Sequence, residues 1–485
     1  MSTYVIRQTT LVLLCASAAL GAPAEGKRGR EKSTPKQPTQ NSTCNDVPAH
    51  AVDVILCRPT CDSVTLSTLA YGDLQASIAY GTRRGQLNLQ SPVRRFNKGE
   101  PTEVTLGSLR PDTRYYFELR ADGVGDTQGT FHTQRARGSE FTFTITADSH
   151  LDDRANAGLY QRTLANALAD APDFHIDLGD TFMTEKHDNR ENAARQYLAQ
   201  RFYFGQLCHS APLFFVLGNH DGESPRGRGS EADSLAVWSN LMRKRYFPNP
   251  VPDSFFTGDS ARHPEAGLLQ DYFAWEWGDA LFVVLDPYWF TQQQRGQKDN
   301  WKRSLGVHQY EWLQQTLAAS RASFKFVFIH HLAGGSTPEG RGGAEAVPFF
   351  EWGGKNLDGS DGFGDHRPGW AAPVHPLLVR HHVSAVFHGH DHLYAKQDCD
   401  GIVYQEVPQP GTPGNKRVPT AAEYGYVSGV IHSSSGHVRV RISSDQANVD
   451  YVRSYLPDDE RSDRRNAEVA HSYKISAPAK PAAGK

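Results

Sequence analysis

The chain has 485 residues, of which 38% are hydrophobic, 11% aromatic and 22% charged, and its formal net charge is −3. These fractions exclude an intrinsically disordered or membrane-embedded chain and are typical of a soluble globular protein. The small net charge and the lack of clustered basic residues in the folded part argue against a nucleic-acid-binding scaffold. At this length we expect two domains with flexible ends.

The first 24 residues have the pattern of a secretory signal peptide. Arg7 precedes an apolar run from Leu11 to Leu20, and a small-residue cleavage pattern, A-P-A, occupies residues 22–24. The run is too short to span a bilayer, and no later segment is long and apolar enough to enter one. We therefore expect a secreted or periplasmic protein without a membrane anchor. The polar residues 25–46 that follow are expected to form a disordered linker.

Removal of a signal peptide would leave five cysteines, which are Cys44, Cys57, Cys61, Cys208 and Cys399. An odd number leaves at least one thiol unpaired within a monomer. Export permits disulfides, and we expect Cys44 to pair with Cys57 or Cys61, although the sequence alone leaves the pairing open. We do not favour a metal site at Cys57 and Cys61, because no second Cys or His pair lies nearby.

Residues 47–137 show short β-type runs separated by turn residues, namely VDVIL, SVTLSTLAY, LQASIAYG, EVTLGSL, TRYYFELRA and TQGTFHTQ. This spacing predicts a small β-sandwich. The stretch from Leu109 to Tyr115 resembles the corner segment of fibronectin type III domains, in which a tyrosine hydroxyl bonds to the nearby backbone. The region has no His, Asp or Glu at ligand spacing. We therefore interpret it as a structural or substrate-shaping module.

Residues 138–457 alternate buried strands with longer amphipathic stretches, such as Gly158 to Ala169 and Gln309 to Ala319. This alternation predicts layered helices and sheets. The strands read FTFTITAD, DFHIDLGD, PLFFVLGN, FKFVFIH and VSAVFHGH. The last segment, residues 458–485, is charged and then rich in Ala, Pro and Lys, so we expect a flexible tail.

Each of these five strands ends in a residue type that binds metals. The residues are Asp148, Asp180, Asn219, His330 and His390, with His150 and His392 two positions after the first and the last. Side chains at the carboxyl ends of strands can converge on one place. A spacing of two keeps side chains on the same side while the chain stays extended. Each motif alone is weak, but ADSH, LGD, GNHD, IHH and GHDH in this order strongly favour a metal site.

These motifs resemble those of the calcineurin-like metallophosphoesterase superfamily. The layout is similar to the branch that includes purple acid phosphatases, in which a fibronectin-like domain precedes the catalytic one. The resemblance covers roughly residues 50 to 455. We therefore expect an α/β four-layer sandwich, with two facing β-sheets flanked by helices, behind the N-terminal all-β sandwich. The seven proposed ligands should converge at one edge.

The resemblance also implies a role for each residue. Asp148, His150 and His392 would bind a first metal ion, Asn219, His330 and His390 a second, and Asp180 would bridge the two. His220 would lie beside the substrate without binding metal, and Asp221 would orient it.

The residue types agree with this assignment. Two aspartates neutralise only part of the charge of two divalent or trivalent ions, which leaves a cationic site suited to phosphate. Imidazole, amide and carboxylate ligands favour Fe, Mn or Zn, with Co and Ni also compatible, over Ca or Mg. A bridging hydroxide would attack the phosphorus in line, and His220 would protonate the leaving group or stabilise charge on the phosphoryl group.

Three positions depart from the family pattern or leave a choice. Purple acid phosphatases have a tyrosine three residues after the bridging aspartate, where this chain has Met183, so a tyrosinate-bound ferric ion is not expected. His330 is preferred over His331 because the family motif places its ligand first, although Leu332 replaces a common proline. His388 precedes the last motif and is interpreted as a neighbour of the site.

The sequence therefore predicts an exported hydrolase of small-molecule phosphate monoesters or diesters. A nucleotide pyrophosphatase or phosphodiesterase with the same site is an alternative, because fold and ligands do not dictate the substrate. A non-catalytic extracellular binding or adhesion protein is a second alternative, against which His220 argues. The natural substrate, the metals, the pH optimum and the oligomeric state stay open.

Overall fold

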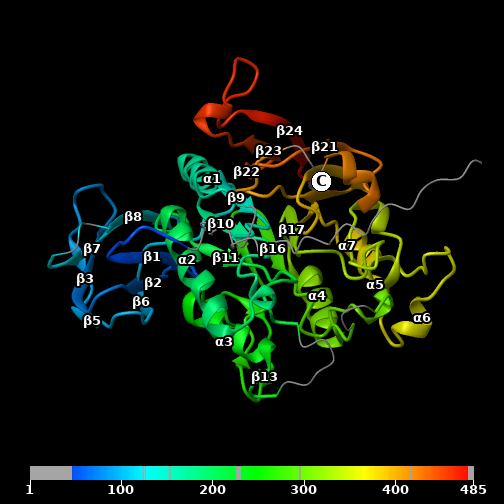
Figure 1. The fold of residues 1–485 in the computed structure, drawn as a ribbon, viewed down its shortest axis with the longest axis horizontal. Helices are drawn as coiled ribbons and strands as arrows, with labels where there is room; N and C mark the ends of the chain where they lie inside the picture. The colour runs from blue at the N-terminus through cyan, green and yellow to red at the C-terminus, as the bar shows by residue number, and fades with distance from the viewer. Residues whose placement is uncertain are drawn as a thin grey trace, which may run out of the picture. The chain divides into compact units, whose positions relative to one another are not determined.

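The structure is a computed structural model that describes residues 46–123, 125, 127–151, 155–224, 231–293, 297–414 and 418–478 (Figure 1). The expected signal peptide, almost all of the expected linker and Cys44 lie outside the described residues. Among those described, Cys57, Cys61, Cys208 and Cys399 form no disulfide with one another. No described helix has the length and apolarity needed to cross a membrane.

The N-terminal part is a β-sandwich, as predicted. One sheet has the order β1-β2-β6, and the other has the order β4-β3-β7-β8 with β5 paired to β3. The strands are β1 (Val52–Cys57), β2 (Val64–Ala70), β3 (Leu74–Gly81), β4 (Leu89–Gln90), β5 (Arg94–Phe96), β6 (Thr102–Leu106), β7 (Arg114–Ala121) and β8 (Thr127–His132). Alternating apolar residues of both sheets form a core that includes Leu66, Ile78 and Phe117.

Tyr115, near the start of β7, makes the backbone contact that was predicted for it. The backbone N–H of Arg110 donates to the Tyr115 hydroxyl at 2.9 Å. The buried ring stacks on Phe131 with the ring centroids 5.4 Å apart. This contact ties the loop before β7 to the core of the sandwich.

The remaining strands build two large sheets. A six-stranded sheet has the order β11-β10-β9-β22-β23-β24, and an eight-stranded sheet has the order β12-β15-β16-β17-β18-β20-β19-β21. The first contains β9 (Phe141–Thr146), β10 (Phe174–Asp177), β11 (Leu213–Phe215), β22 (Gly436–Ile442), β23 (Gln446–Arg453) and β24 (Val469–Ser476). The second contains β12 (Thr257–Gly258), β15 (Phe273–Trp277), β16 (Ala280–Val284), β17 (Phe324–Phe328), β18 (Ala385–His388), β19 (Tyr394–Cys399), β20 (Ile402–Glu406) and β21 (Val430–His432). A small hairpin joins β13 (Arg262–His263) to β14 (Gly267–Leu268).

The two sheets face each other across an aromatic core. Phe143 of β9 contacts Phe282 of β16, with ring centroids 5.1 Å apart, and Phe326 of β17 at 5.8 Å. Phe214 of β11 stacks on Trp275 of β15 at 3.9 Å. Side chains this large and this well packed bury enough apolar surface to hold the two sheets together.

Helices cover the outer faces of both sheets, which confirms the predicted four layers. The helices α1 (Ala157–Ala169), α2 (Arg190–Cys208) and α3 (Leu235–Tyr246) pack on the side of β11. The helices α4 (Val307–Ala319), α5 (Phe350–Gly353) and α7 (Val374–Arg380) pack on β16 to β18, and α6 (Phe363–His366) precedes α7. Asn156, Asn189 and Ser234 cap the first three helices, each accepting a backbone N–H with its side chain. The 3-10 turns are η1 (Thr184–Lys186), η2 (Asn300–Lys302), η3 (Ala344–Ala346), η4 (Val418–Tyr424) and η5 (Pro457–Asp459).

The C-terminal segment differs from its predicted flexible tail. Residues 469–476 form β24, which pairs antiparallel with β23 at the edge of the six-stranded sheet. Its side chains alternate between partly buried and exposed positions, so half of the strand packs while Lys474 and the two serines face solvent. The prediction of a flexible tail from residue 458 is wrong for this strand, and residues 479–485 lie outside the described part.

Arg201 of α2 joins the β-sandwich to the larger part of the chain. Its guanidinium is fully buried and donates to the backbone carbonyls of Asp53, Ser67 and Tyr246 at 2.8–3.1 Å and to the Ser67 hydroxyl at 3.0 Å. A buried cation whose two terminal nitrogens bond carbonyls of both parts ties them together.

Candidate metal centre

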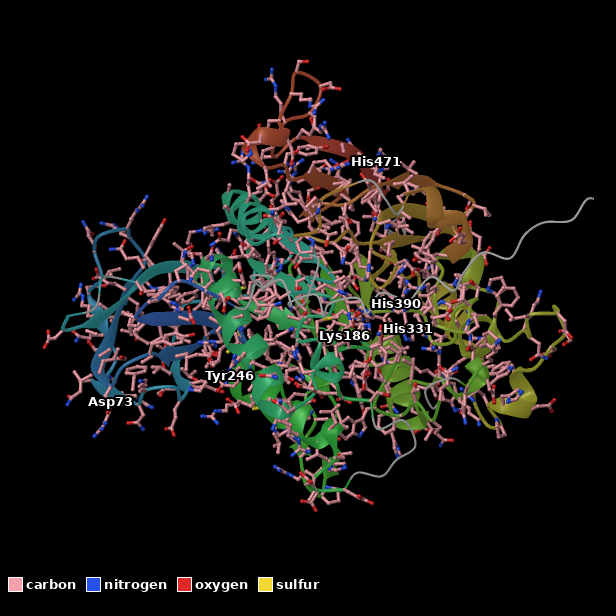
Figure 2. All side chains as sticks on the ribbon, in the orientation of Figure 1. Asp73, Lys186, Tyr246, His331, His390 and His471 are labelled. Carbon is pink, nitrogen blue, oxygen red and sulfur yellow. The ribbon has the colours of Figure 1, made fainter. Side chains whose placement is uncertain are left out.

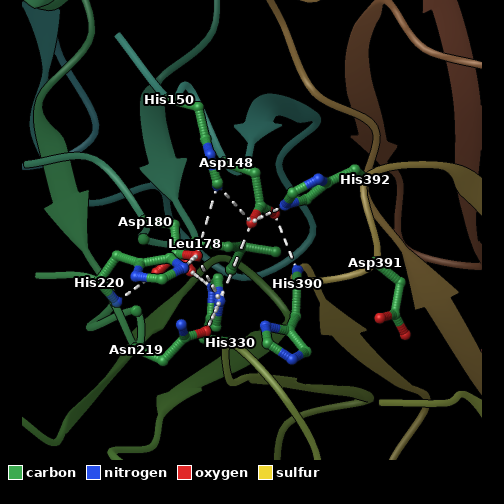
Figure 3. A network of polar contacts seen from close by, with 12 residues as sticks. Asp148, His150, Leu178, Asp180, Asn219, His220, His330, His390, Asp391 and His392 are labelled. Carbon is green, nitrogen blue, oxygen red and sulfur yellow. Dashed lines mark hydrogen bonds and ion pairs between the residues drawn. The ribbon is translucent and has the colours of Figure 1, made fainter. Parts of the chain in front are cut away.

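The predicted ligands lie in loops that directly follow parallel strands. The strands β9, β10 and β11 are parallel neighbours in one sheet, and β17 and β18 are parallel neighbours in the other. Asp148 and His150 follow β9, Asp180 follows β10, Asn219 follows β11, His330 follows β17, and His390 and His392 follow β18. Figure 3 shows these side chains gathered in one cluster. The structure therefore brings all seven together, as the strand ends predicted.

The loops reach this arrangement by a different backbone path from the one expected. Asp148, His150, Asp180, His390 and His392 all have left-handed backbone, with φ between 45° and 81°. Their strands end before them, so pairs two residues apart converge through tight turns, and the expected extended chain is wrong. Non-glycine residues adopt this conformation at a cost, and such strain concentrates at functional sites.

The loops after β10 and β11 also pack closely on each other. Gly179 has a φ of 93°, and a Cβ at this position would clash with the backbone of Gly218. A Cβ at Gly218 would in turn clash with the backbone of Asp180. The glycines of LGD and GNHD therefore allow Asp180 and Asn219 to lie side by side.

Two carboxylate oxygens and the surrounding imidazoles form the centre of the cluster. Asp148 Oδ1 lies 3.2 Å from His392 Nε2 and 3.5 Å from His150 Nε2. Asp180 Oδ2 lies 3.4 Å from the Nε2 atoms of both His150 and His330. Ligand atoms within 4.8 Å of one another fall into two groups, which share Asp180 and are Asp148, His150, Asp180 and His392 on one side and Asp180, His330 and His390 on the other.

Several of these atoms lack the hydrogen bonds that buried polar groups normally make. Asp148 Oδ1, Asp180 Oδ2 and His150 Nε2 are buried and have no hydrogen-bond partner among the described residues. Unsatisfied buried oxygens and nitrogens are costly, and they face one another across a few ångströms. A cation at this place would satisfy them together, so the residues present fit a metal centre.

The charges of the cluster also fit a metal centre. Burial opposes protonation of His150 and His330, but the two aspartates raise the pKa of His150 to about 9 and that of His330 to about 10. Burial would raise the pKa of Asp148 and Asp180, but the facing imidazoles hold both well below the ordinary value. The carboxylates are therefore anionic and demand nearby positive charge. Burial and Arg341 lower the pKa of His390, which keeps its ring neutral.

The choice between the adjacent histidines is clear in the structure. His330 Nε2 lies 3.2 Å from Asn219 Oδ1, and its Nδ1 bonds the Leu178 carbonyl at 2.7 Å, which fixes the ring toward the cluster. His331 lies next to His390, with ring centroids 5.3 Å apart (Figure 2), but its Nε2 faces the Arg303 guanidinium at 3.3 Å. His330 is thus in the cluster, and His331 forms part of its surroundings.

His388 lies outside the cluster, as predicted, and supports the chain behind it. Its Nδ1 lies 2.6 Å from Glu406 Oε2. The other carboxylate oxygen, Glu406 Oε1, accepts the backbone N–H of Asp391 at 2.9 Å. This pair therefore holds the start of the GHDH loop.

His220 lies at the rim of the cluster, and its orienting partner is Glu185. The His220 Nδ1 atom is 2.8 Å from Glu185 Oε1, and its Nε2 atom is 4.0 Å from Asp180 Oδ2. About a quarter of the His220 side chain is exposed. The ring is therefore held by a carboxylate from η1 with its other nitrogen directed to the centre (Figure 3).

Asp221 has a different role from the one expected. Its Oδ1 accepts the backbone N–H groups of Thr181 and Phe182, and its Oδ2 accepts those of Asp180 and Gly218, at 2.7–3.0 Å. Both oxygens are engaged with the backbone, so the prediction that Asp221 orients His220 is wrong. Asp221 instead holds the loop that presents Asp180.

Arg341 and Asp391 hold the last motif and were not anticipated from the sequence. Arg341 Nη1 donates to the His390 carbonyl at 3.0 Å and to Asp391 Oδ1 at 2.8 Å. Asp391 Oδ2 accepts the Tyr426 hydroxyl at 2.8 Å, and the Asp391 side chain points away from the cluster (Figure 3). The histidines on either side of Asp391 are thereby fixed. A lone arginine in a Gly-rich segment has no sequence signal for this role.

The fold and the cluster define a metal-dependent phosphoester hydrolase with a candidate metal site. Residues 141–394, more than half of the chain, match the calcineurin-like phosphoesterase family, and the chain belongs to it. No curated protein matches the sequence.

Two solved structures share the fold over most of the chain. PhoD has a TM-score of 0.58 at 14% identity, with 87% of this chain and 88% of PhoD covered. A purple acid phosphatase from yellow lupin (Lupinus luteus) seeds has a TM-score of 0.57 at 15% identity, with 90% of this chain and 78% of the phosphatase covered. These two structures show the shared fold, and the family match confirms the predicted calcineurin-like superfamily.

Proposed function

We propose that the protein hydrolyses small-molecule phosphate monoesters or diesters at two metal ions bridged by Asp180. Asp148, His150 and His392 bind the first ion, and Asn219, His330 and His390 bind the second. The observation that carries this assignment is that Asp180 belongs to both groups of candidate ligands, while its buried Oδ2 has no hydrogen bond and lies 3.4 Å from the Nε2 atoms of His150 and His330. One carboxylate placed between two sets of imidazoles is the arrangement that a shared ligand requires.

The donor set suits the binding of phosphate. Two ions with at least two positive charges each outweigh the two carboxylates, while the His and Asn ligands add no negative charge. Bound metal ions would supply Lewis acidity and a water molecule acidified for in-line attack. Met183 is fully buried where a tyrosinate ligand would be needed for a purple ferric centre. We therefore propose Fe, Mn or Zn without that tyrosinate.

The pair of His220 and Glu185 supplies the second part of the chemistry. Glu185 accepts a hydrogen bond from Nδ1–H of His220, so Nε2 faces the substrate side of the cluster and carries a transferable proton in the imidazolium form. From there the ring can donate a proton to the departing oxygen or a hydrogen bond to the phosphoryl group. His220 is therefore proposed as the catalytic residue and Glu185 as its positioning residue.

Removal of the metals tests this function directly. We expect the purified protein to hydrolyse nitrophenyl phosphate, its bis-ester or a pyrophosphate bond, and to lose that activity after dialysis against a chelator. Activity should return with Fe, Mn or Zn but not with Ca, because the ligands include imidazoles. The relative rates on the three substrates separate a phosphatase from a phosphodiesterase and a nucleotide pyrophosphatase. Undiminished hydrolysis in the chelated protein would contradict the proposal.

We also propose that the protein is exported and that its N-terminal sandwich is a fibronectin type III-like domain. Export rests on the signal-type pattern of residues 1–24, and the domain rests on its two sheets and the contact between Arg110 and Tyr115. The mature protein recovered from its natural source should begin near Glu25. N-terminal sequencing that finds an intact terminus would overturn the export proposal.

A further inference from the structure

A second convergence of metal-binding side chains lies away from the metal centre, where the β19–β20 hairpin meets α7. His375 comes from α7, Cys399 ends β19, and Asp400 is the first residue of the turn. One ligand atom from each lies within 4.8 Å of the others. The three residues are separate from the seven ligands above and lie at the opposite end of β19 from His392.

The hairpin presents Cys399 and Asp400 in a defined geometry. Cys399 pairs with Ile402, so Asp400 and Gly401 form a two-residue turn. Both have positive φ, at 49° and 82°, as a type I′ turn requires. An Asp-Gly pair is well suited to this turn, and the turn holds the thiol and the carboxylate next to each other.

His375 is held in place by buried aromatic residues. Its Nδ1 is 2.7 Å from the Tyr404 hydroxyl, which also accepts the Trp352 indole N–H at 2.9 Å. All three side chains are buried. Anchoring one ring nitrogen this way is how proteins orient a histidine that binds metal through the other. The Nε2 atom lies 3.0 Å from Asp400 Oδ2 and 3.9 Å from Cys399 Sγ.

We propose that His375 Nε2, Cys399 Sγ and Asp400 Oδ2 bind a zinc ion. A sulfur, an imidazole nitrogen and a carboxylate oxygen are the donors that Zn²⁺ takes in tetrahedral sites, and their separations allow a small shift to that geometry. Asp400 is largely exposed, with 71% of its side chain accessible, so water can fill the fourth position. Binding converts the Cys399 thiol to a thiolate and releases its proton to solvent.

The ion would act as a clip between α7 and the tip of the hairpin. It would tie the far end of β19 to a helix, whereas the near end follows the GHDH loop. Because none of the three residues contacts the metal centre, the clip should stabilise the fold without taking part in hydrolysis. An ion that binds only the folded chain raises its stability by mass action.

Sulfur ligation distinguishes this site from the metal centre, which has no cysteine. X-ray absorption of the zinc-loaded full-length protein should show a Zn–S distance of about 2.3 Å beside the Zn–N and Zn–O distances of about 2.0–2.2 Å. Cobalt-loaded protein should show a thiolate charge-transfer band in the near ultraviolet. Both signals should be absent from Cys399→Ser, and the zinc content of this variant should fall by one ion per chain while hydrolysis is kept.

Matched variants separate ligation from a general disturbance. Cys61→Ser removes a partly exposed cysteine and should leave the sulfur signals unchanged. Asp400→Asn should weaken zinc binding at this site by at least about tenfold, whereas Asp398→Asn on the same hairpin should not. A lack of sulfur ligation at saturating zinc, or a cobalt band that persists in Cys399→Ser, would overturn the proposal and leave only an ion pair between His375 and Asp400. Neither result bears on the metal centre, which is tested by hydrolysis.

Discussion

Asp180→Ala is expected to lose metal as well as activity, because Asp180 is the proposed ligand shared by the two ions. Its Oδ2 lies between His150 and His330, and its removal leaves the first ion with Asp148 as its carboxylate ligand and the second ion with neutral ligands alone. Each ion contributes several kcal/mol of transition-state stabilisation, and about 1.4 kcal/mol is a factor of ten in rate. We therefore expect the turnover number to fall by about 10³-fold or more, with elemental analysis showing fewer than two ions per chain.

A matched variant and a folding check make the result specific. Asp188→Ala removes an exposed aspartate that accepts hydrogen bonds from the side chains of Asn189 and Asn192 at the start of α2, and it should keep both ions and full activity. Circular dichroism of Asp180→Ala should match that of the parent protein, since the loop backbone is held by Asp221. A folded Asp180→Ala that retains two ions would show that this carboxylate is not the bridge.

The strand framework and the ligand set could be predicted because both signals are local in the sequence. Buried strands appear as short apolar runs, and a residue such as Asp148 or His330 directly after a run must lie at the edge of the sheet. Five such runs in order leave few alternatives. The assignment of His330 rather than His331 needed the family resemblance, because adjacent residues on a strand end are equivalent in the pattern.

The orienting contacts could not be predicted in the same way. Glu185 reaches His220 across 35 positions of sequence from a short 3-10 turn, and nothing distinguishes it from other surface glutamates. Asp221, by contrast, follows His220 directly, but the turn sends its carboxylate back to the backbone of the loop before η1. In a tight turn the side chains of two adjacent residues can point in different directions. The adjacency of Asp221 and His220 in the sequence therefore did not indicate a contact between their side chains.

Backbone conformation and the last strand were also missed for physical reasons. Positive φ is uncommon for any non-glycine residue, although Asp and His adopt it more often than most, so Asp148 and His150 were assigned to extended chain. Strand β24 has a half-exposed sequence of mixed polar and apolar residues because it lies at a sheet edge. Its alternation was present in the sequence but was obscured by the charged residues before it.

The second large effect is expected in His220→Ala. His220 is proposed to bind no metal, so this variant should keep close to two ions per chain while catalysis falls. A general acid contributes about 10²–10⁴-fold, and we expect a loss of that size for alkyl phosphate esters, whose leaving oxygen needs a proton. The loss should be much smaller for nitrophenyl esters, because their departing oxygen is already stable as an anion.

Glu185→Ala extends the test to the partner of His220. Without the carboxylate 2.8 Å from Nδ1, the ring loses its fixed orientation, and we expect a smaller loss of about 10–100-fold with the same dependence on the leaving group. Glu191→Ala, which removes an exposed glutamate paired with Arg195, is the matched control. It should leave the rates of hydrolysis of both substrate classes unchanged. Kinetics on good and poor leaving groups, beside elemental analysis of all three variants, separate a proton-transfer role from a metal-binding one. Full activity of His220→Ala on alkyl esters would exclude His220 as the general acid, even if both ions stay bound. Equal losses on alkyl and nitrophenyl esters would instead assign His220 to stabilisation of the phosphoryl group.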